Sequence, residues 1–179
     1  PGLVIWPTHR LVYGIADFSA PKLLEGCGQH FEMSAVGNTD ELDSRLAKAK
    51  KPAYGLVLPN GLHYLELKDL AVMDKRAANM PAPWRELDVS VLHLLILEDL
   101  LGIDEGKLLR KENILYSKNS AEAVRMAQTG AEGTQVGFIL RSTLMSQVCS
   151  VARAGAVMPQ KSTYFYPKAL SGLVLHLFW

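Results

Sequence analysis

The stretch Ala53-Tyr54-Gly55-Leu56-Val57-Leu58-Pro59-Asn60-Gly61-Leu62-His63-Tyr64-Leu65-Glu66-Leu67-Lys68 decides much of the fold. Residues 53–58 and 62–68 are two apolar runs of strand length, and the turn-forming residues Pro59-Asn60-Gly61 separate them. Asn-Gly between two such runs is a strong local signal of a β-hairpin. The stretch therefore predicts two adjacent antiparallel strands in the first half of the chain.

Two helices and a strand are predicted before this hairpin. Ser19 and Pro21 are typical of a helix start, and a short helix should follow them. Residues 31–36 are predicted as a strand, and Asn38-Thr39-Asp40-Glu41 predicts the start of a second helix. After the hairpin, residues 69–87 contain two prolines and mixed charge, and they are predicted as a loop or connector.

The second half of the chain alternates strands and helices. Asp88 is predicted to cap the strongest helix, residues 89–101, whose apolar residues run nearly all the way round and favour a covered, central position. Strands are predicted at residues 113–116 and 135–140, and helices at residues 120–129 and 143–154. Strand–helix–strand order at this spacing is typical of crossover units with parallel strands. Together with the hairpin, it predicts an α/β or α+β fold with a mixed sheet.

The chain of 179 residues is long enough for one globular domain. We predict a single globular segment over residues 1–179, with a subdivision into residues 1–68 and 88–179 as the alternative. The first residues, Pro1 to Trp6, and the last, Leu173 to Trp179, are apolar and strand-like, whereas chain ends are usually polar. We therefore expect residues 3–5 and 173–178 to pair within a sheet, and the sequence to belong to a longer chain.

Composition excludes several classes of protein. Hydrophobic residues make up 49% and charged residues 21%, which is typical of a globular domain. The formal net charge of +1 argues against a nucleic acid partner. No apolar run is long enough for a transmembrane helix, so no membrane partner is expected. Cys27 and Cys149 form no disulfide framework, which favours the cytoplasm, and Cys27 with His30 does not complete a zinc site.

Positive charge collects at the two ends of the sequence. Residues 133–179 contain no acidic residue and four basic ones, which are Arg141, Arg153, Lys161 and Lys168. No acidic residue precedes Asp17, and His9 and Arg10 lie in that first stretch. Uncompensated cations in one region are what a bound phosphate or carboxylate requires. The alternative is that these side chains are solvated or pair with acids from elsewhere in the fold.

The most informative motif is Met158-Pro159-Gln160-Lys161-Ser162-Thr163-Tyr164-Phe165-Tyr166-Pro167-Lys168. Two prolines restrict a loop that offers lysine charges, two hydroxyls and two phenols, and such a loop suits an anionic or ring-bearing ligand. The alternative is an ordered loop that covers the core with its aromatic rings. We predict that this loop and Pro7-Thr8-His9-Arg10 line one basic pocket. Its ligand-binding residues would be His9, Arg10, Lys161, Ser162, Thr163, Tyr164, Tyr166 and Lys168. His93 is expected to be a hydrogen-bonded core histidine.

Three segments resemble one known family: Pro7-Thr8-His9-Arg10, Leu87-Asp88-Val89-Ser90-Val91-Leu92-His93 and the loop at residues 158–168. The sequence resembles, over its whole length, the bacterial and archaeal family catalogued as domain of unknown function 1015. Members of that family are longer, which implies that this chain is the C-terminal part of such a protein. Upstream they carry an Asp-Gly-His-His-Arg motif, which this chain lacks. That motif is similar to one in the ParB and sulfiredoxin-like proteins, some of which bind nucleotides or phosphorylate free serine.

Two functions fit these observations. In the first, the chain is one lobe of a phosphate- or nucleotide-handling enzyme, and it provides a basic pocket for a phosphorylated small molecule or a nucleotide. The N-terminal part of the longer chain would then supply the acid–base groups. In the second, the chain is a non-catalytic small-molecule-binding or protein-interaction domain. No acid–base pair, nucleophile triad or metal cluster is complete in the sequence, so no catalytic residue or cofactor is assigned. A homo-oligomer remains an open alternative.

Overall fold

A computed structural model of the protein describes residue 2 and residues 4–168. Six strands form one sheet in the order β3-β5-β4-β7-β2-β6, and β1 and β8 form a separate ribbon. The strands are β1 (Val4–Trp6), β2 (His9–Tyr13), β3 (Phe31–Val36), β4 (Ala53–Leu58), β5 (Gly61–Leu67), β6 (Ile114–Ser117), β7 (Thr134–Ile139) and β8 (Tyr164–Tyr166). The helices are α1 (Ala20–His30), α2 (Thr39–Lys48), α3 (Ala71–Arg76), α4 (Ala82–Arg85), α5 (Asp88–Val91), the π-helix η1 (Leu92–Glu98), α6 (Glu105–Arg110), α7 (Ser120–Thr129), the 3-10 helix η2 (Ala131–Gly133) and α8 (Met145–Arg153).

The predicted combination of helices and strands is confirmed, but the prediction of a mixed sheet is wrong. Every strand pair in the described part of the chain is antiparallel. β6 and β7 are joined by α7, as in a crossover unit, and both run antiparallel to β2. They therefore point in the same direction, but β2 lies between them. The prediction failed because a strand from far away in the sequence separates the two strands that would otherwise pair in parallel.

The sheet consists of two units with the same design. In the first unit, β3 and β4 are joined by α2 and flank β5; in the second, β6 and β7 are joined by α7 and flank β2. The units meet where β4 pairs with β7, with Leu56 opposite Phe138. The predicted hairpin is confirmed, because β4 and β5 pair from Ala53 opposite Glu66 to Leu58 opposite Gly61.

Two glycines let the helix of each unit approach the sheet closely. Gly55 in β4 and Gly137 in β7 both come one residue before the central pair. A Cβ atom at Gly55 would collide with the side chain of Leu42 on α2, and one at Gly137 would lie 2.9 Å from the Cβ of Ala127 on α7. A glycine in the strand beneath the helix therefore permits the close packing of both α2 and α7.

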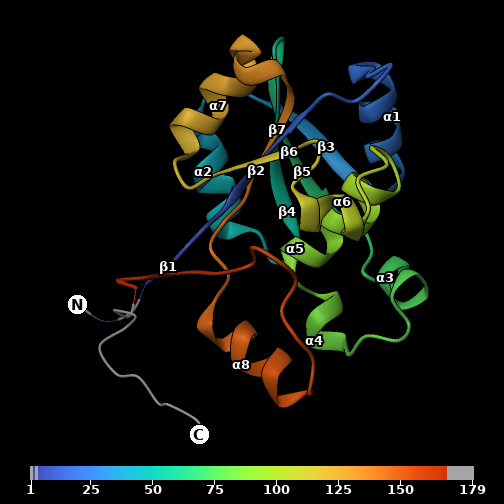
Figure 1. Ribbon diagram of the computed structural model, residues 1–179, viewed down its shortest axis with the longest axis vertical. Coiled ribbons are helices and arrows are strands. Elements are labelled where there is room, and N and C mark those ends of the chain that lie inside the picture. The colour runs from blue at the N-terminus through green and yellow to red at the C-terminus, as the bar shows by residue number, and fades with distance from the viewer. Residues whose placement is uncertain (1, 3, 169–179) are drawn as a thin grey trace, which may run out of the picture.

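The sheet is covered on both faces (Figure 1). α2 and α7 pack on one face, where the core includes Leu11, Leu42 and Ala127. α1, α5 with η1, and α6 pack on the other face, where the core includes Val12 and Leu95. Leu11 and Val12 are neighbours on β2 and belong to different cores, because successive strand residues point to opposite faces.

The apolar helix predicted at residues 89–101 is central but differs in detail. It begins as α5 and continues as the π-helix η1, in which Leu92, Leu95, Ile96 and Leu97 are buried. The prediction that Asp88 caps this helix is wrong. Leu87 holds the cap position, and the Asp88 carboxylate accepts hydrogen bonds from Arg141 Nε at 2.7 Å and Nη2 at 3.1 Å.

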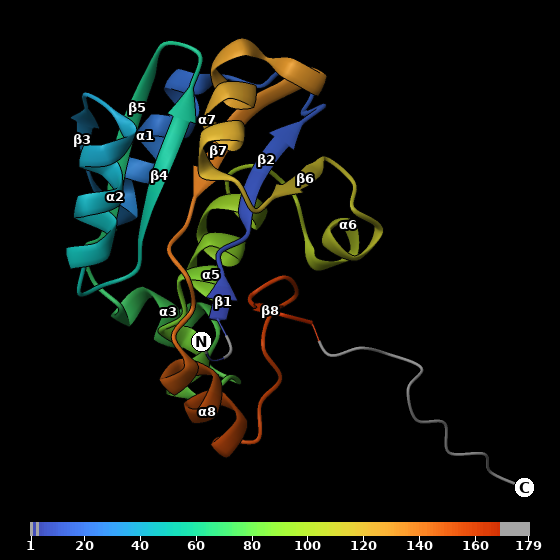
Figure 2. The same ribbon diagram turned by 90° about the vertical axis from the view of Figure 1, so that its left-hand side faces the viewer.

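The structure also shows the expected connector and the strand near the start of the chain. Residues 69–87, predicted as a loop or connector, contain the two short helices α3 and α4, and Pro83 lies in the first turn of α4, where a proline is tolerated. β1 pairs with β8 apart from the main sheet, as Figure 2 shows. The strand expected at residues 173–178 lies outside the described residues.

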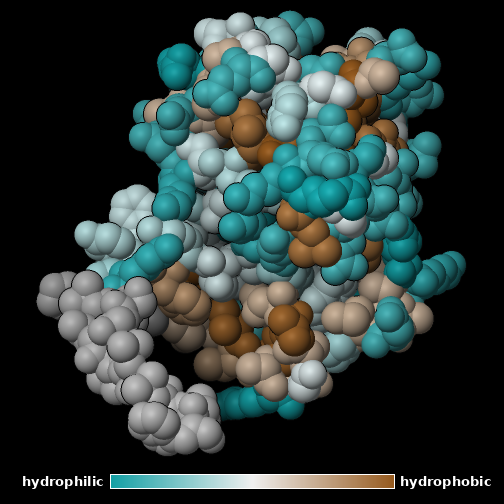
Figure 3. Space-filling view, in the orientation of Figure 1, coloured by the Kyte–Doolittle hydropathy of each residue, from teal (hydrophilic) through white to brown (hydrophobic). Residues whose placement is uncertain are grey.

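α8 is the least embedded of the longer helices. Val151 is its buried residue, and Cys149 is exposed. Leu144, Met145 and Val157 nearby are exposed. Figure 3 shows apolar side chains on the surface in the lower part of the view. Among the described residues, no helix combines the length and the apolar character needed to cross a membrane.

Candidate anion site

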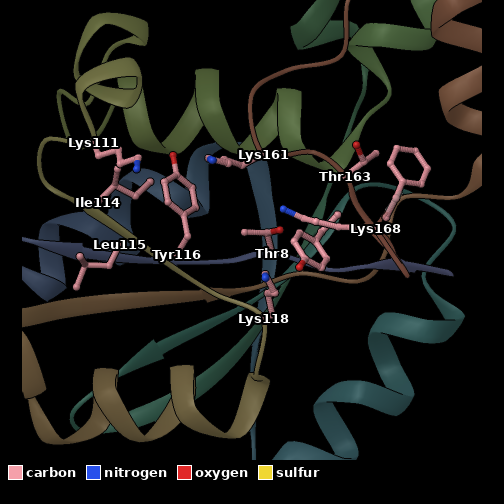
Figure 4. A pocket seen from close by; sticks show the side chains of 11 residues that line it. Thr8, Lys111, Ile114, Leu115, Tyr116, Lys118, Lys161, Thr163 and Lys168 are labelled. Carbon is pink, nitrogen blue, oxygen red and sulfur yellow. The ribbon is translucent and has the colours of Figure 1, made fainter. Parts of the chain in front are cut away.

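A pocket of about 920 Å³ opens between β6 and the last loop of the described chain. It is lined by Thr8, Lys111, Ile114, Leu115, Tyr116, Lys118, Lys161, Thr163, Tyr164, Phe165 and Lys168. Four of these eleven residues are lysines and none is acidic. Figure 4 shows Lys118, Lys161 and Lys168 extending toward a common space. This set of residues is named the lysine pocket.

The positive charge of the lysine pocket is not neutralised by any acidic side chain in the described part of the chain. Within residues 4–168, none of its four lysines forms an ion pair. The Nζ atoms of Lys118 and Lys168 lie 3.4 Å and 5.0 Å from the ring centre of Tyr164. A hydrogen bond from Lys118, and the charges of Lys118 and Lys168, lower the pKa of Tyr164. Cation–π contacts stabilise the ammonium groups but cancel no charge, so the pocket remains positive.

A buried arginine lies beneath this pocket. Arg10 is 1% exposed and donates hydrogen bonds to the carbonyl of Thr8 and, from Nη2 at 3.0 Å, to the carbonyl of Lys161. Its Nε atom has no partner, and no carboxylate pairs with it in the described part of the chain. Burial lowers the pKa of Arg10 to about 10, so the guanidinium is charged at neutral pH. It adds a positive charge under the pocket floor.

The same arginine holds the loop that carries Lys161. The φ angle of Lys161 is 58°, a left-handed conformation that costs a residue other than glycine about 1–2 kcal/mol. The hydrogen bond from Arg10 to the Lys161 carbonyl supports this conformation. Thr143 Oγ1 donates to the Ser162 carbonyl at 2.9 Å, and the buried Ser162 hydroxyl donates to the Pro159 carbonyl. The loop is therefore fixed from two sides.

His9 lies on the other side of the sheet from Arg10. The two residues are neighbours on β2, and alternation along the strand sends them to opposite faces. His9 is 2% exposed, and its Nδ1 accepts a hydrogen bond from the Leu140 amide at 3.2 Å. Burial and the charge of Arg10 lower the pKa of His9 to about 4, so the imidazole is neutral. The expectation that His9 joins Arg10 in one pocket ignored this alternation.

The other predicted site residues divide into two groups. Those that line the lysine pocket are Lys161, Thr163, Tyr164 and Lys168. Tyr166 lies outside it, is 55% exposed, and packs edge-on against Trp6 with ring centres 6.2 Å apart. Ser162 lies under the loop with its hydroxyl bound to backbone.

Sequence reasoning missed three pocket residues that can donate hydrogen bonds, Lys111, Tyr116 and Lys118. Tyr116 and Lys118 are two positions apart at the end of β6, so they lie on one side of an edge strand. That spacing was the available signal. It was hidden because nearby acidic residues, such as Glu112, conceal these lysines in any count of local charge.

The acid-free stretch also contains a structural arginine. Arg141 forms a bidentate ion pair with Asp88 and donates from Nη2 to the Lys51 carbonyl at 3.0 Å. Arg141 therefore fits the alternative that a cation of this stretch pairs with an acid from elsewhere in the fold. Between residues 4 and 168, no group of three or more His, Cys, Asp or Glu side chains is arranged to hold a metal ion.

The family described as "Protein of unknown function (DUF1015)" matches residues 1–90, which is half of the chain. The chain belongs to this family. The sequence matches no protein of curated function.

Solved structures share the fold at low sequence identity. A conserved hypothetical protein from Pyrococcus furiosus is similar with a TM-score of 0.53 and 12% identity, over 92% of this chain and 56% of that one. A free serine kinase in complex with AMP is similar with a TM-score of 0.53 and 12% identity, over 91% of this chain and 54% of that one. A mutant free serine kinase in complex with ADP has a TM-score of 0.50, also at 12% identity, with the same two coverages of 91% and 54%. This chain thus spans little more than half the length of these proteins, and the likeness establishes the fold alone.

Proposed function

We propose that the lysine pocket binds the phosphate groups of a nucleotide or of another phosphorylated small molecule, as one lobe of a phosphate-handling enzyme. The observation that carries this proposal is the presence of four lysines, and of no acidic residue, among the eleven residues of the pocket. Lysine is a common ligand of phosphate, and a site without carboxylates does not repel it. The unpaired charge of Arg10 beneath the floor strengthens the same preference.

Three observations favour a nucleotide over a simple phosphate. The rings of Tyr116 and Tyr164 line the pocket, and an aromatic face is a stacking surface for a base. The volume of about 920 Å³ is within the range of pockets that bind small molecules. The AMP and ADP complexes of proteins with this fold support the same class of ligand.

The proposal assigns binding, and not the chemical step, to this pocket. The eleven residues include no carboxylate and no histidine, which are the groups that most often transfer protons in catalysis. In the enzymatic alternative, those groups come from outside the pocket. In the second alternative, a non-catalytic binding domain, the same pocket captures its ligand without turnover.

Calorimetric titration with inorganic phosphate, AMP, ADP and ATP tests the proposal. Lys161→Gln removes one charge and keeps a residue other than glycine at the left-handed position. We expect it to weaken nucleotide binding at least tenfold, because hydrogen bonds between charged groups contribute about 1.5–3 kcal/mol. The melting temperature of the protein should stay unchanged. Lys75→Gln, on the exposed surface of α3 and outside the pocket, is the matched control.

Equal nucleotide affinity in the Lys161→Gln and Lys75→Gln variants would refute phosphate binding in this pocket. Where binding is found, ³¹P NMR over several hours of a nucleotide bound to the longer chain, which in the enzymatic alternative supplies the acid–base groups, distinguishes an enzyme from a binding domain. New phosphorus signals support the enzymatic alternative, and an unchanged spectrum supports the non-catalytic one.

A further inference from the structure

The main sheet ends at the lysine pocket with the open edge of a strand. β6 is the last strand in the order β3-β5-β4-β7-β2-β6, and within the described residues it pairs with β2 alone. Figure 2 shows β6 at the margin of the sheet, beyond β2. Three consecutive residues of this strand, Ile114, Leu115 and Tyr116, line the pocket.

These three residues show that the pocket reaches the backbone of β6. Ile114 and Tyr116 pack with the core on one face of the sheet, and Leu115 packs with the core on the other face. Successive side chains of a strand point to opposite faces, so a pocket that touches all three passes around the edge of the sheet. The wall of the pocket is there the unpaired side of the strand.

The hydrogen-bond register identifies the backbone groups on that side. The Tyr13 amide donates to the Asn113 carbonyl at 3.2 Å, so these two residues form a hydrogen-bonded pair. Such pairs alternate along an antiparallel ladder, so Leu115 turns its N–H and C=O toward β2, whereas Ile114 and Tyr116 turn theirs away. These outward groups have no backbone partner in the described part of the chain. An edge of this kind is a template for a further strand.

The charges beside this edge define the strand that would fit it. Lys111 lies shortly before β6 and Lys118 directly follows it, while Lys161 and Lys168 line the same pocket from the last loop. None of the four forms an ion pair with a described residue. A basic strand would be repelled here, and an acidic one would be attracted.

We infer that the lysine pocket binds an extended peptide with anionic side chains, which adds to β6 as a seventh strand of the main sheet. Main-chain hydrogen bonds to Ile114 and Tyr116 hold the peptide, and the lysines select its carboxylate or phosphate groups. The inference goes beyond the proposed function, because a nucleotide has no peptide backbone to pair with the strand.

Fluorescence anisotropy with capped hexapeptides tests the inference. The first probe alternates glutamate and valine, and the second carries phosphoserine in place of each glutamate, so their relative affinities show which anionic group the lysines prefer. Two further probes are N-methylated forms of the first peptide, modified on every glutamate or on every valine. Successive residues of a strand point their N–H groups in opposite directions. One methylated form should therefore bind at least tenfold more weakly, and the other should bind like the unmodified peptide.

Amide hydrogen exchange measured by NMR locates the bound peptide. Exchange of the Ile114 and Tyr116 amides should slow at least tenfold in the complex. Met33, on the opposite edge strand β3, is the internal control. Its amide also points away from the sheet, because the Lys68 amide donates to the His30 carbonyl at 2.9 Å and the same alternation follows. Its exchange rate should not change.

Two variants test the contribution of charge. Lys118→Gln should weaken binding of the glutamate peptide about two- to fivefold, the range for a partly exposed ion pair. Lys75→Gln, outside the pocket, is the matched control and should bind like wild type.

The outcomes separate this inference from nucleotide binding. If nucleotides bind and neither anionic peptide does, the inference is wrong while the proposed function stands; if a peptide binds and nucleotides do not, the reverse holds. Equal affinity of the two methylated forms would show that charge alone holds the peptide, and it would overturn strand addition. Unchanged exchange at Ile114 and Tyr116 in a saturated complex would also overturn it.

Discussion

Acid should destabilise this protein through two histidines near Arg10, of which His9 is buried and His93 is half-buried. Burial, together with the charge of Arg10, lowers the pKa of His9 to about 4 and that of His93 to about 3, from an ordinary value of 6.5. In the folded protein, both side chains are therefore still neutral at about pH 5. In the unfolded chain at that pH, both are mostly protonated.

The direction and size of the effect follow from this difference. Because the unfolded chain binds more protons, the free energy of unfolding falls as the pH drops below 6.5. Between pH 7.5 and pH 5, each histidine removes about 2 kcal/mol, since pH 5 is about 1.5 units below the unfolded pKa and above both folded values. The two together remove about 4 kcal/mol, a large part of the roughly 5–15 kcal/mol that stabilises a typical domain.

Urea unfolding followed by circular dichroism at these two pH values measures the effect. His9→Asn places an acceptor near the Nδ1 position, and His93→Gln places an amide near Nε2. Neither replacement titrates. Each single variant should recover about 2 kcal/mol of the pH-dependent loss, and the double variant nearly all of it. A double variant that loses as much stability as wild type between the two pH values would refute the reasoning, because other groups would then cause the loss.

Three further substitutions test the packing, each by urea unfolding at pH 7.5. Leu95→Ala should destabilise by roughly 2–5 kcal/mol, because Leu95 is buried in the central helix; a loss below about 1 kcal/mol would contradict that position. Gly137→Ala should cost about 1–3 kcal/mol, since the new methyl group would lie 2.9 Å from Ala127; an unchanged midpoint would mean that α7 can move away freely. Asp88→Asn should cost about 2–3 kcal/mol because it leaves the guanidinium of Arg141 without its charged partner, and wild-type stability would show that this ion pair contributes nothing.

Local sequence patterns predicted the elements well where each element has its own start and stop signals. The helix predicted at residues 120–129 is α7, residue for residue, and Gly130 follows it in the left-handed conformation. The strand predicted at residues 31–36 is β3. The pairing of strands could not be predicted in the same way. No local pattern tells that β2 is placed between β6 and β7, because that choice is made by contacts between distant parts of the chain.

The candidate site was predictable only in part, for a similar reason. The lysines and hydroxyls of the loop at residues 158–168 were recognisable in the sequence, and four of its predicted residues line the lysine pocket. His9 and Arg10 were expected to line one pocket. They are successive residues of β2, so their side chains point to opposite faces of the sheet. Lys118 was missed because only the folded structure shows where it lies. It follows the edge strand β6 and lines two neighbouring pockets.

The placement of β2 has a consequence for how the chain reaches this structure. The first unit, α1-β3-α2-β4-β5, is contiguous in sequence, so it can assemble from local contacts as soon as it is made. The second unit, α6-β6-α7-β7, is not contiguous in the same way. Its middle strand is β2, which lies near the start of the sequence, about a hundred residues before β6. Because closing so large a loop slows folding, we expect β2 to dock late. A circular permutant that moves β2 to a position after β7 would give both units the same order of elements, and folding of the second unit would become as local as that of the first.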